Sequence, residues 1–128
     1  MIRINNIRKD RSAFTLVEIM IVVAIIGLLA ALAIPGFEKA RKQSQGRRIL
    51  NDARQMDAAI DQWALETGQT DGNTINTTSA QTYLKTLWKV TDLLGNTFNL
   101  TVVGTSQMSV NAATKTSLAG VGIDWGAY

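Results

Sequence analysis

The chain of 128 residues is 46% hydrophobic and 18% charged, and it contains no cysteine and no histidine. Their absence excludes disulfides, thiol nucleophiles and thiolate zinc sites, and it removes the commonest general base. The net charge of +3 comes entirely from residues 1–13, which hold four basic residues and one acidic residue, so the remaining residues sum to zero. The overall basicity therefore gives little support to nucleic acid as a primary partner.

Residues 14–37 form a long apolar segment in which Glu18 is the only charged residue. As a helix rising about 1.5 Å per residue, Phe14 to Pro35 would span roughly 30 Å, the thickness of a bilayer hydrocarbon core. A domain this small cannot bury a helix that is apolar on every side. We therefore expect a membrane, or a bundle of partner helices, to cover this segment.

Three interpretations of the apolar segment compete. A secretory signal peptide cut after Ala31-Leu32-Ala33 would release a secreted binding module, but the core is too long for one and contains Glu18. An ordinary single-pass anchor is the second, although basic residues flank both ends and do not orient it. The third is a segment that spans the membrane and then leaves it to pack against copies of itself. Only the third explains Glu18.

A carboxylate such as Glu18 near the edge of a bilayer core costs about 2–3 kcal/mol and usually marks a function. Cleavage between Ala13 and Phe14 would create an α-amine four residues before it. In a helical array the amine of one subunit would pair with Glu18 of its neighbour and set the axial register. The alternative is a protonated or snorkelling carboxyl group without a role.

Residues 13–35 read AFTLVEIMIVVAIIGLLAALAIP and follow a short basic leader. A Phe directly after the cut, a Glu as the fifth mature residue and a Pro as the twenty-second resemble the amino-terminal segment of type IV pilins and type II secretion pseudopilins. Two features depart from that pattern. Ala13 stands where the family usually has Gly, and the carboxy-terminal disulfide loop of many pilins is absent.

The resemblance implies that a prepilin peptidase removes the leader, residues 1–13, by cutting between Ala13 and Phe14, and then methylates the amine of Phe14. It further implies a single-pass precursor in the inner membrane and then a homopolymeric helical filament in the periplasm or at the cell surface. An inner-membrane assembly platform and its ATPase would drive assembly, since the chain lacks a phosphate-binding loop. The implied function is structural and not enzymatic: a pilus subunit for adhesion, motility or DNA uptake, or a secretion pseudopilus subunit.

Beyond the apolar segment, Pro35 and Gly36 predict a kink or a loosened helix. The helix is expected to continue to about residue 66 and to stop at Gly68, with one apolar stripe facing a core. That stripe consists of Ile49, Ala53, Met56, Ile60 and Trp63.

Residues 38–128 are expected to form a soluble head, so that the whole chain has a pilin-like α+β fold. Thr78 and Gln81 predict a capped short helix that carries Tyr83, Leu84, Leu87 and Trp88. Three alternating runs, at Phe98–Val102, Met108–Val110 and Ala119–Trp125, predict a small antiparallel sheet packed against the long helix.

The sequence offers no catalytic site and no confident metal or cofactor site. Asp92 and Asp124 are weak calcium candidates, and ordinary turn-forming aspartates are the alternative. Trp63, Trp88 and Trp125 are expected to be core aromatics. The basic stretch from Lys39 to Arg48 is interpreted as a solvated helix face, with attraction for lipid or DNA phosphates as the alternative.

Overall fold

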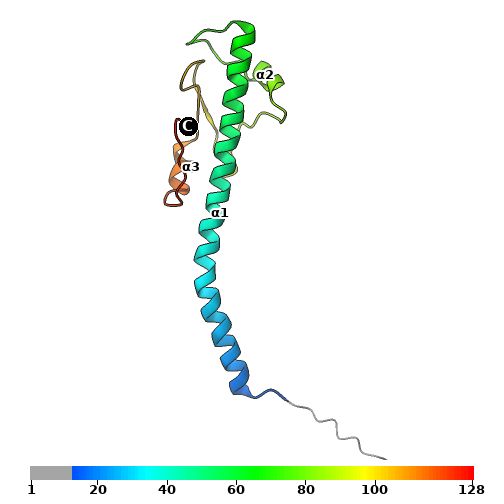
Figure 1. The fold of residues 1–128 in the computed structure, drawn as a ribbon, viewed down its shortest axis with the longest axis vertical. Coiled ribbons are helices and arrows are strands. Elements are labelled where there is room, and N and C mark those ends of the chain that lie inside the picture. Colours follow the sequence, from blue (N-terminus) through cyan, green and yellow to red (C-terminus); the bar gives the residue numbers. More distant parts are fainter. Residues whose placement is uncertain (1–12) are drawn as a thin grey trace, which may run out of the picture. The chain divides into compact units, whose positions relative to one another are not determined.

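The computed structural model describes residues 13–128, and it divides into two compact units that meet after Gly36 (Figure 1). Helix α1, Leu16–Thr67, runs through Pro35 and contributes to both units. The unit boundary falls next to the Pro35-Gly36 pair, although the kink expected there stays a prediction. The predicted leader, except for Ala13, lies outside the described residues.

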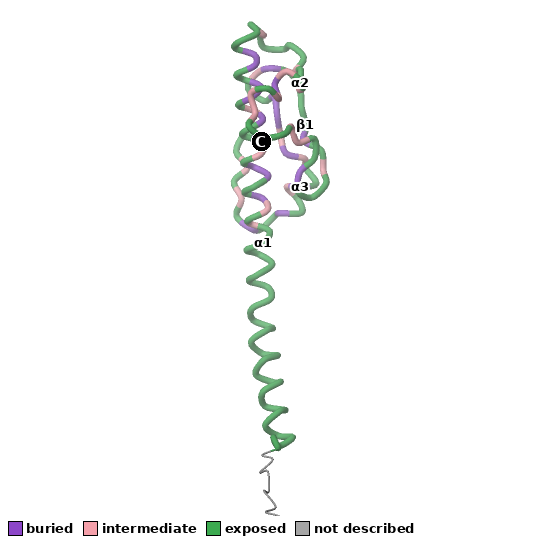
Figure 2. The backbone as a smooth tube through the Cα atoms, turned by 90° about the vertical axis from the view of Figure 1, so that its right-hand side faces the viewer, coloured by how far each residue is buried: buried purple, intermediate pink, exposed green. Residues whose placement is uncertain are grey.

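The second unit, Phe37–Tyr128, is the head, and its core is built on α1. All five residues of the predicted stripe are buried, and the rest of the unit lies on one side of the helix (Figure 2). The predicted helix end is also confirmed. Gly68 has a φ of +68°, and the Gln69 N–H donates to the Ala64 carbonyl oxygen at 2.8 Å. This is the Schellman arrangement, in which a left-handed glycine lets the last carbonyls find partners.

The predicted α+β fold is confirmed, but the sheet has two strands where three were expected. Strand β1, Asn99–Leu100, pairs antiparallel with β2, Met108–Ser109. Met108 lies in the same hydrophobic cluster as the stripe of α1. The sheet therefore reaches the long helix through β2, while both residues of β1 are exposed.

The prediction of a third strand at Ala119–Trp125 was wrong. Gly120 and Gly122 have φ values of +78° and +72°, and such left-handed residues interrupt an extended strand. Directly before this run lies a helix that the alternation did not predict, α3, Ala112–Ser117, whose amino-terminal cap is Asn111. The Asn111 side chain accepts a hydrogen bond from the Ala113 N–H at 2.9 Å.

The short helix that was expected to be capped by Thr78 is capped two residues earlier and ends sooner. Helix α2, Thr77–Ala80, is capped by Asn76, whose side chain accepts from the Ser79 N–H at 3.1 Å. A 3₁₀ turn, η1, Gln81–Tyr83, follows it. Leu87 and Trp88 consequently lie in a connection without regular secondary structure, where Leu87 is 78% exposed while Trp88 packs partly against the core.

Residues near the carboxy terminus pack against α1 at Gly46, the first buried residue of the helix. An ideal Cβ on Gly46 would lie 1.9 Å from Ile123 Cδ1, 3.1 Å from Ile123 Cγ1 and 3.4 Å from Leu118 Cδ1. The absence of a side chain at Gly46 therefore lets this segment pack directly against the backbone of α1.

We expect Gly46→Val to lower the free energy of unfolding of the head by about 1–3 kcal/mol, because the new methyl groups overlap Ile123. Urea unfolding of the full chain in detergent, followed by tryptophan fluorescence, reports on the head because all three tryptophans lie in it. Ser44→Val is the matched control, since Ser44 is exposed in the same helix. Equal losses in the two variants would contradict the close-packing account.

Candidate functional site

The apolar part of α1 in the first unit is uncovered along its length (Figure 2). Every residue from Ala13 to Gly36 is exposed, and the exposed fraction of Phe14 reaches 81%. By length and composition, α1 is a helix that could cross a membrane. So much exposed apolar surface marks a contact with lipid or with other chains, because a monomer in water rarely leaves a large continuous patch uncovered.

The start of α1 is a capping box formed by Thr15 and Glu18. The Thr15 N–H donates to Glu18 Oε2 at 2.9 Å, and the Glu18 N–H donates to Thr15 Oγ1 at 3.3 Å. Each side chain therefore satisfies a backbone donor that the first turn of a helix leaves without a partner. Sequence reasoning assigned no role to Thr15, although the Thr-x-x-Glu spacing is the signal that could have found it.

The same box gives Glu18 two sources of stabilisation within its own chain. Its carboxylate accepts a backbone hydrogen bond, and it lies at the positive end of the helix macrodipole. Only Oε2 is engaged among the described residues, so Oε1 is free to meet a cation from elsewhere. The capped carboxylate therefore combines a fixed position with unused hydrogen-bonding capacity.

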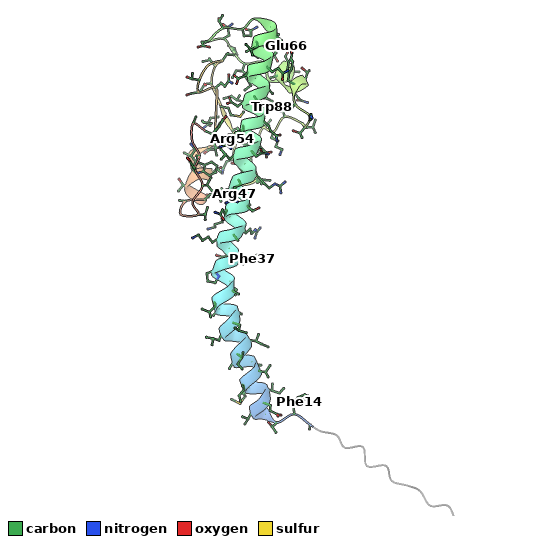
Figure 3. The ribbon with its side chains drawn as sticks, in the orientation of Figure 1. Phe14, Phe37, Arg47, Arg54, Glu66 and Trp88 are labelled. Atoms are coloured by element: carbon green, nitrogen blue, oxygen red, sulfur yellow. The ribbon has the colours of Figure 1, made fainter. Side chains whose placement is uncertain are left out.

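The predicted cleavage site lies immediately outside this helix. Ala13, Phe14 and Thr15 precede the first helical residue and have no regular secondary structure. All three are exposed, and Phe14 projects at the very start of the helical ribbon (Figure 3). The peptide bond between Ala13 and Phe14 is therefore free of the helical hydrogen bonds that would keep it from an extended conformation.

The weak calcium candidate Asp92 belongs to a hydrogen-bonded network inside the head. Its Oδ1 accepts from the Leu94 and Asn96 N–H groups at 2.8 Å and 3.0 Å, and its Oδ2 accepts from the Thr114 hydroxyl. Asn96 also donates to Thr114 through its side chain at 2.9 Å. Because Asp92 and Thr114 are both buried, the network joins the 92–96 turn to α3 in the interior of the head.

The other calcium candidate, Asp124, is engaged in a local turn. Its Oδ1 accepts from the Gly126 N–H at 3.0 Å. Within residues 13–128 no three acidic side chains gather as potential metal ligands. Both aspartates thus hold turns in the described structure, and calcium binding stays a prediction.

The tryptophans lie where the sequence predicted them. Trp63 is buried, and Trp88 and Trp125 pack partly against the hydrophobic cluster. Their indole rings therefore contribute to the packing of the head around α1, as expected for core aromatics.

The last residue of the chain is tied to α1 by a hydrogen bond that depends on protonation. The Tyr128 hydroxyl donates to Asp57 Oδ2 at 2.9 Å. Partial burial, and the hydrogen bond to Asp57, raise the pKa of Tyr128 above its usual 10.0. The pKa of Tyr83 is raised as well, chiefly because its hydroxyl donates to Glu66 at 2.6 Å.

A raised pKa means that the folded head favours the protonated Tyr128. Tyr128 contributes fully to the stability of the head below pH 10.0, its pKa in the unfolded chain. This stabilisation is lost as the pH rises through the higher pKa of Tyr128 in the folded head. We therefore expect the stability difference between the native chain and Tyr128→Phe to narrow between about pH 8 and pH 11. Urea unfolding of the native chain and of Tyr128→Phe at each pH measures this stability difference. Because both proteins contain Tyr83, its titration cancels in the difference. A constant difference would show that the hydrogen bond contributes nothing to stability.

Comparison with known proteins gives matches that cover part of the chain. A family profile described as "Prokaryotic N-terminal methylation motif" matches residues 8–34. The chain is 46% identical over 56 residues to the type IV major fimbrial protein FimA of Dichelobacter nodosus, which covers 44% of this chain and 36% of that protein. It is 39% identical over 59 residues to the type II secretion system core protein G of Pseudomonas aeruginosa, covering 46% of this chain and 42% of that protein.

A fimbrial protein of Pseudomonas aeruginosa is 41% identical over 58 residues, covering 45% of this chain and 38% of that protein. The chain thus spans about two fifths of the length of these relatives. No solved structure matches it.

Proposed function

We propose that this chain, a member of the type IV pilin and pseudopilin family by its amino-terminal segment, is a structural subunit of a pilus-like or pseudopilus filament. One observation carries the proposal: the head encloses its own core, while the apolar half of the same helix is left wholly exposed. Lipid covers such a helix while the precursor is in the membrane, and neighbouring helices cover it once the subunit is in a filament.

In the precursor, residues 14–37 span the inner membrane, and the basic residues before Ala13 lie on the cytoplasmic side. Prepilin peptidase cuts between Ala13 and Phe14 and methylates the new amine. The exposed, non-helical backbone around this bond supports the step, because a peptidase acts on accessible and extended chain. The match to an amino-terminal methylation motif over residues 8–34 supports it independently.

Cleavage changes the electrostatics at the start of α1. The amine released at Phe14 carries a positive charge, and we place it against Glu18 of a neighbouring subunit. The capping box supports this role because it holds the Glu18 carboxylate in place, and no residue from 13 to 128 donates to its Oε1. In the low dielectric between apolar helices the two charges attract strongly, and any register that leaves either one unpaired is penalised.

Polymerisation then exchanges lipid contacts of α1 for contacts between helices. The energy for extraction comes from an ATPase acting through an inner-membrane assembly platform, since the sequence of this chain holds no phosphate-binding loop. The product is a homopolymer with the apolar helices inside and the heads outside. It lies in the periplasm if the filament is a pseudopilus and at the cell surface if it is a pilus.

Deletion of the gene tests this function. Electron microscopy and an assay of exported proteins should show the loss of surface fibres for a pilus subunit, or the loss of protein release for a pseudopilus subunit. Complementation with the native gene is the control. A deletion strain that keeps both its fibres and its protein release would contradict the proposal.

A further inference from the structure

Directly beyond the apolar segment, α1 carries five basic side chains that no described residue neutralises. All five are exposed, and among residues 13–128 the only ion pair joins Lys89 to Asp52. Between Phe37 and Asn51 the only acidic residue is Glu38. We call this group the basic collar, and it consists of Lys39, Arg41, Lys42, Arg47 and Arg48.

The collar surrounds the helix and does not form a stripe. With about 100° between successive residues, its members are spread over roughly 260° of the helix circumference. The buried residues of the head begin only at Gly46, so most of this stretch of α1 is uncovered (Figure 3). Charges directed to so many sides fit a medium that surrounds the helix better than a partner that covers one face.

The first three members of the collar lie at the depth of the headgroup layer of a bilayer. Lys39, Arg41 and Lys42 are about 3–8 Å beyond Phe37 along the helix axis, and the headgroup layer is roughly 5–7 Å thick on each side. Arg47 and Arg48 are about 15–17 Å beyond Phe37. Helical side chains lean toward the amino terminus, which here is the direction of the apolar segment. Arg47 and Arg48 can therefore reach back toward the phosphates, in the way that basic residues near membrane helix ends do.

Arg47 and Arg48 also border a shallow groove of about 310 Å³ in the head that offers hydrogen-bond donors and no carboxylate. Its remaining lining residues are Ala40, Gln43, Ser44 and Asn51. Guanidinium groups flanked by amide and hydroxyl donors suit a phosphate diester, which accepts hydrogen bonds and carries a negative charge.

We propose that the basic collar binds the phosphate groups of anionic phospholipids in the leaflet from which α1 emerges. This inference rests on the proposed function, because it requires residues 14–37 to lie in the membrane. The bound lipids hold the head at the bilayer surface before assembly, and extraction of the subunit breaks these contacts.

The test uses the full chain reconstituted in phosphatidylcholine vesicles, with spin-labelled phosphatidylglycerol or spin-labelled phosphatidylcholine as the probe. Electron paramagnetic resonance gives the ratio of the association constants of the two lipids at the protein surface. We expect phosphatidylglycerol to be preferred at least about threefold at low salt, with the preference falling toward one in 1 M salt. The double variant Arg47→Gln, Arg48→Gln should lower the ratio, and neutralising the whole collar should bring it to one.

The matched control is Lys85→Gln, Lys115→Gln, which removes the same net charge from the head outside the collar. It should keep the native ratio, and an equal loss in both double variants would overturn the collar as the binding site.

Other outcomes would overturn different parts of the proposal. If the native chain resists carbonate extraction but shows a lipid association ratio of one, the lipid assignment alone is wrong. The lipid assignment would also be wrong if the collar variants assembled poorly while the native chain showed no lipid preference. Acidic groups of a second copy of the chain would then be the partner of the collar. A chain that carbonate extracts would overturn the membrane placement, and with it the proposed function.

Discussion

Glu18→Ala should leave leader removal intact and lower the yield of assembled filaments at least about tenfold. Each contact between neighbouring subunits would lose an ion pair in a low-dielectric setting, and a loss of only about 1.4 kcal/mol already changes an equilibrium tenfold. Cleavage should persist because Glu18 lies inside the helix while the cut precedes it. Immunoblots for the processed chain and electron microscopy of sheared filaments measure the two outcomes.

The structure supplies a sharper version of this experiment, because Glu18 both caps the helix and carries a charge. Glutamine can also serve in a capping box, so Glu18→Gln keeps the acceptor for the Thr15 N–H and removes only the charge. Thr15→Ala does the opposite, since it removes one half of the box and keeps the carboxylate. We expect Glu18→Gln to assemble as poorly as Glu18→Ala, and Thr15→Ala to assemble much better than either. Normal filaments from Glu18→Gln would show that capping, and not charge pairing, is what assembly requires.

The second large effect is expected inside the head, at Asp92. Asp92→Ala should lower the free energy of unfolding by about 2–4 kcal/mol, because it leaves the Leu94 and Asn96 N–H groups and the buried Thr114 hydroxyl without their acceptor. Such a loss is a large fraction of the roughly 5–15 kcal/mol by which folded domains are usually stable. Urea unfolding followed by tryptophan fluorescence would then show an unfolding midpoint at a clearly lower urea concentration.

Asp124→Ala is the control for Asp92→Ala, because Asp124 is exposed and accepts a single hydrogen bond from the described part of the chain, that of the Gly126 N–H. We expect it to change stability by less than about 0.5 kcal/mol. If the two variants proved equally stable, the interior network would not be what joins the turn to α3.

The long helix was predictable because its signals are local and repeated. The apolar segment, the five-residue stripe and Gly68 each act through neighbours within a few positions, and all three agree on one helix. The capping box at Thr15 and Glu18 was equally local, and its spacing was visible in the sequence. It was missed because Glu18 was considered only as a charged group.

The details of the head were not predictable in the same way. Alternation at Ala119–Trp125 resembles a strand, but Gly120 and Gly122 take positive φ values that only the folded path of the chain requires. The contact of Asp92 with Thr114 joins residues 22 positions apart, and no spacing rule relates them. The close approach of Ile123 to Gly46 is of the same kind, since it depends on where the end of the chain returns.

Mass spectrometry of the intact mature chain, purified from its native host, tests most directly whether proteolysis creates the amine that Glu18 binds. We expect a mature chain that begins at Phe14 and carries one methyl group on its amine. A mature chain that begins at Ile34, or one that retains residues 1–13 within assembled filaments, would contradict it.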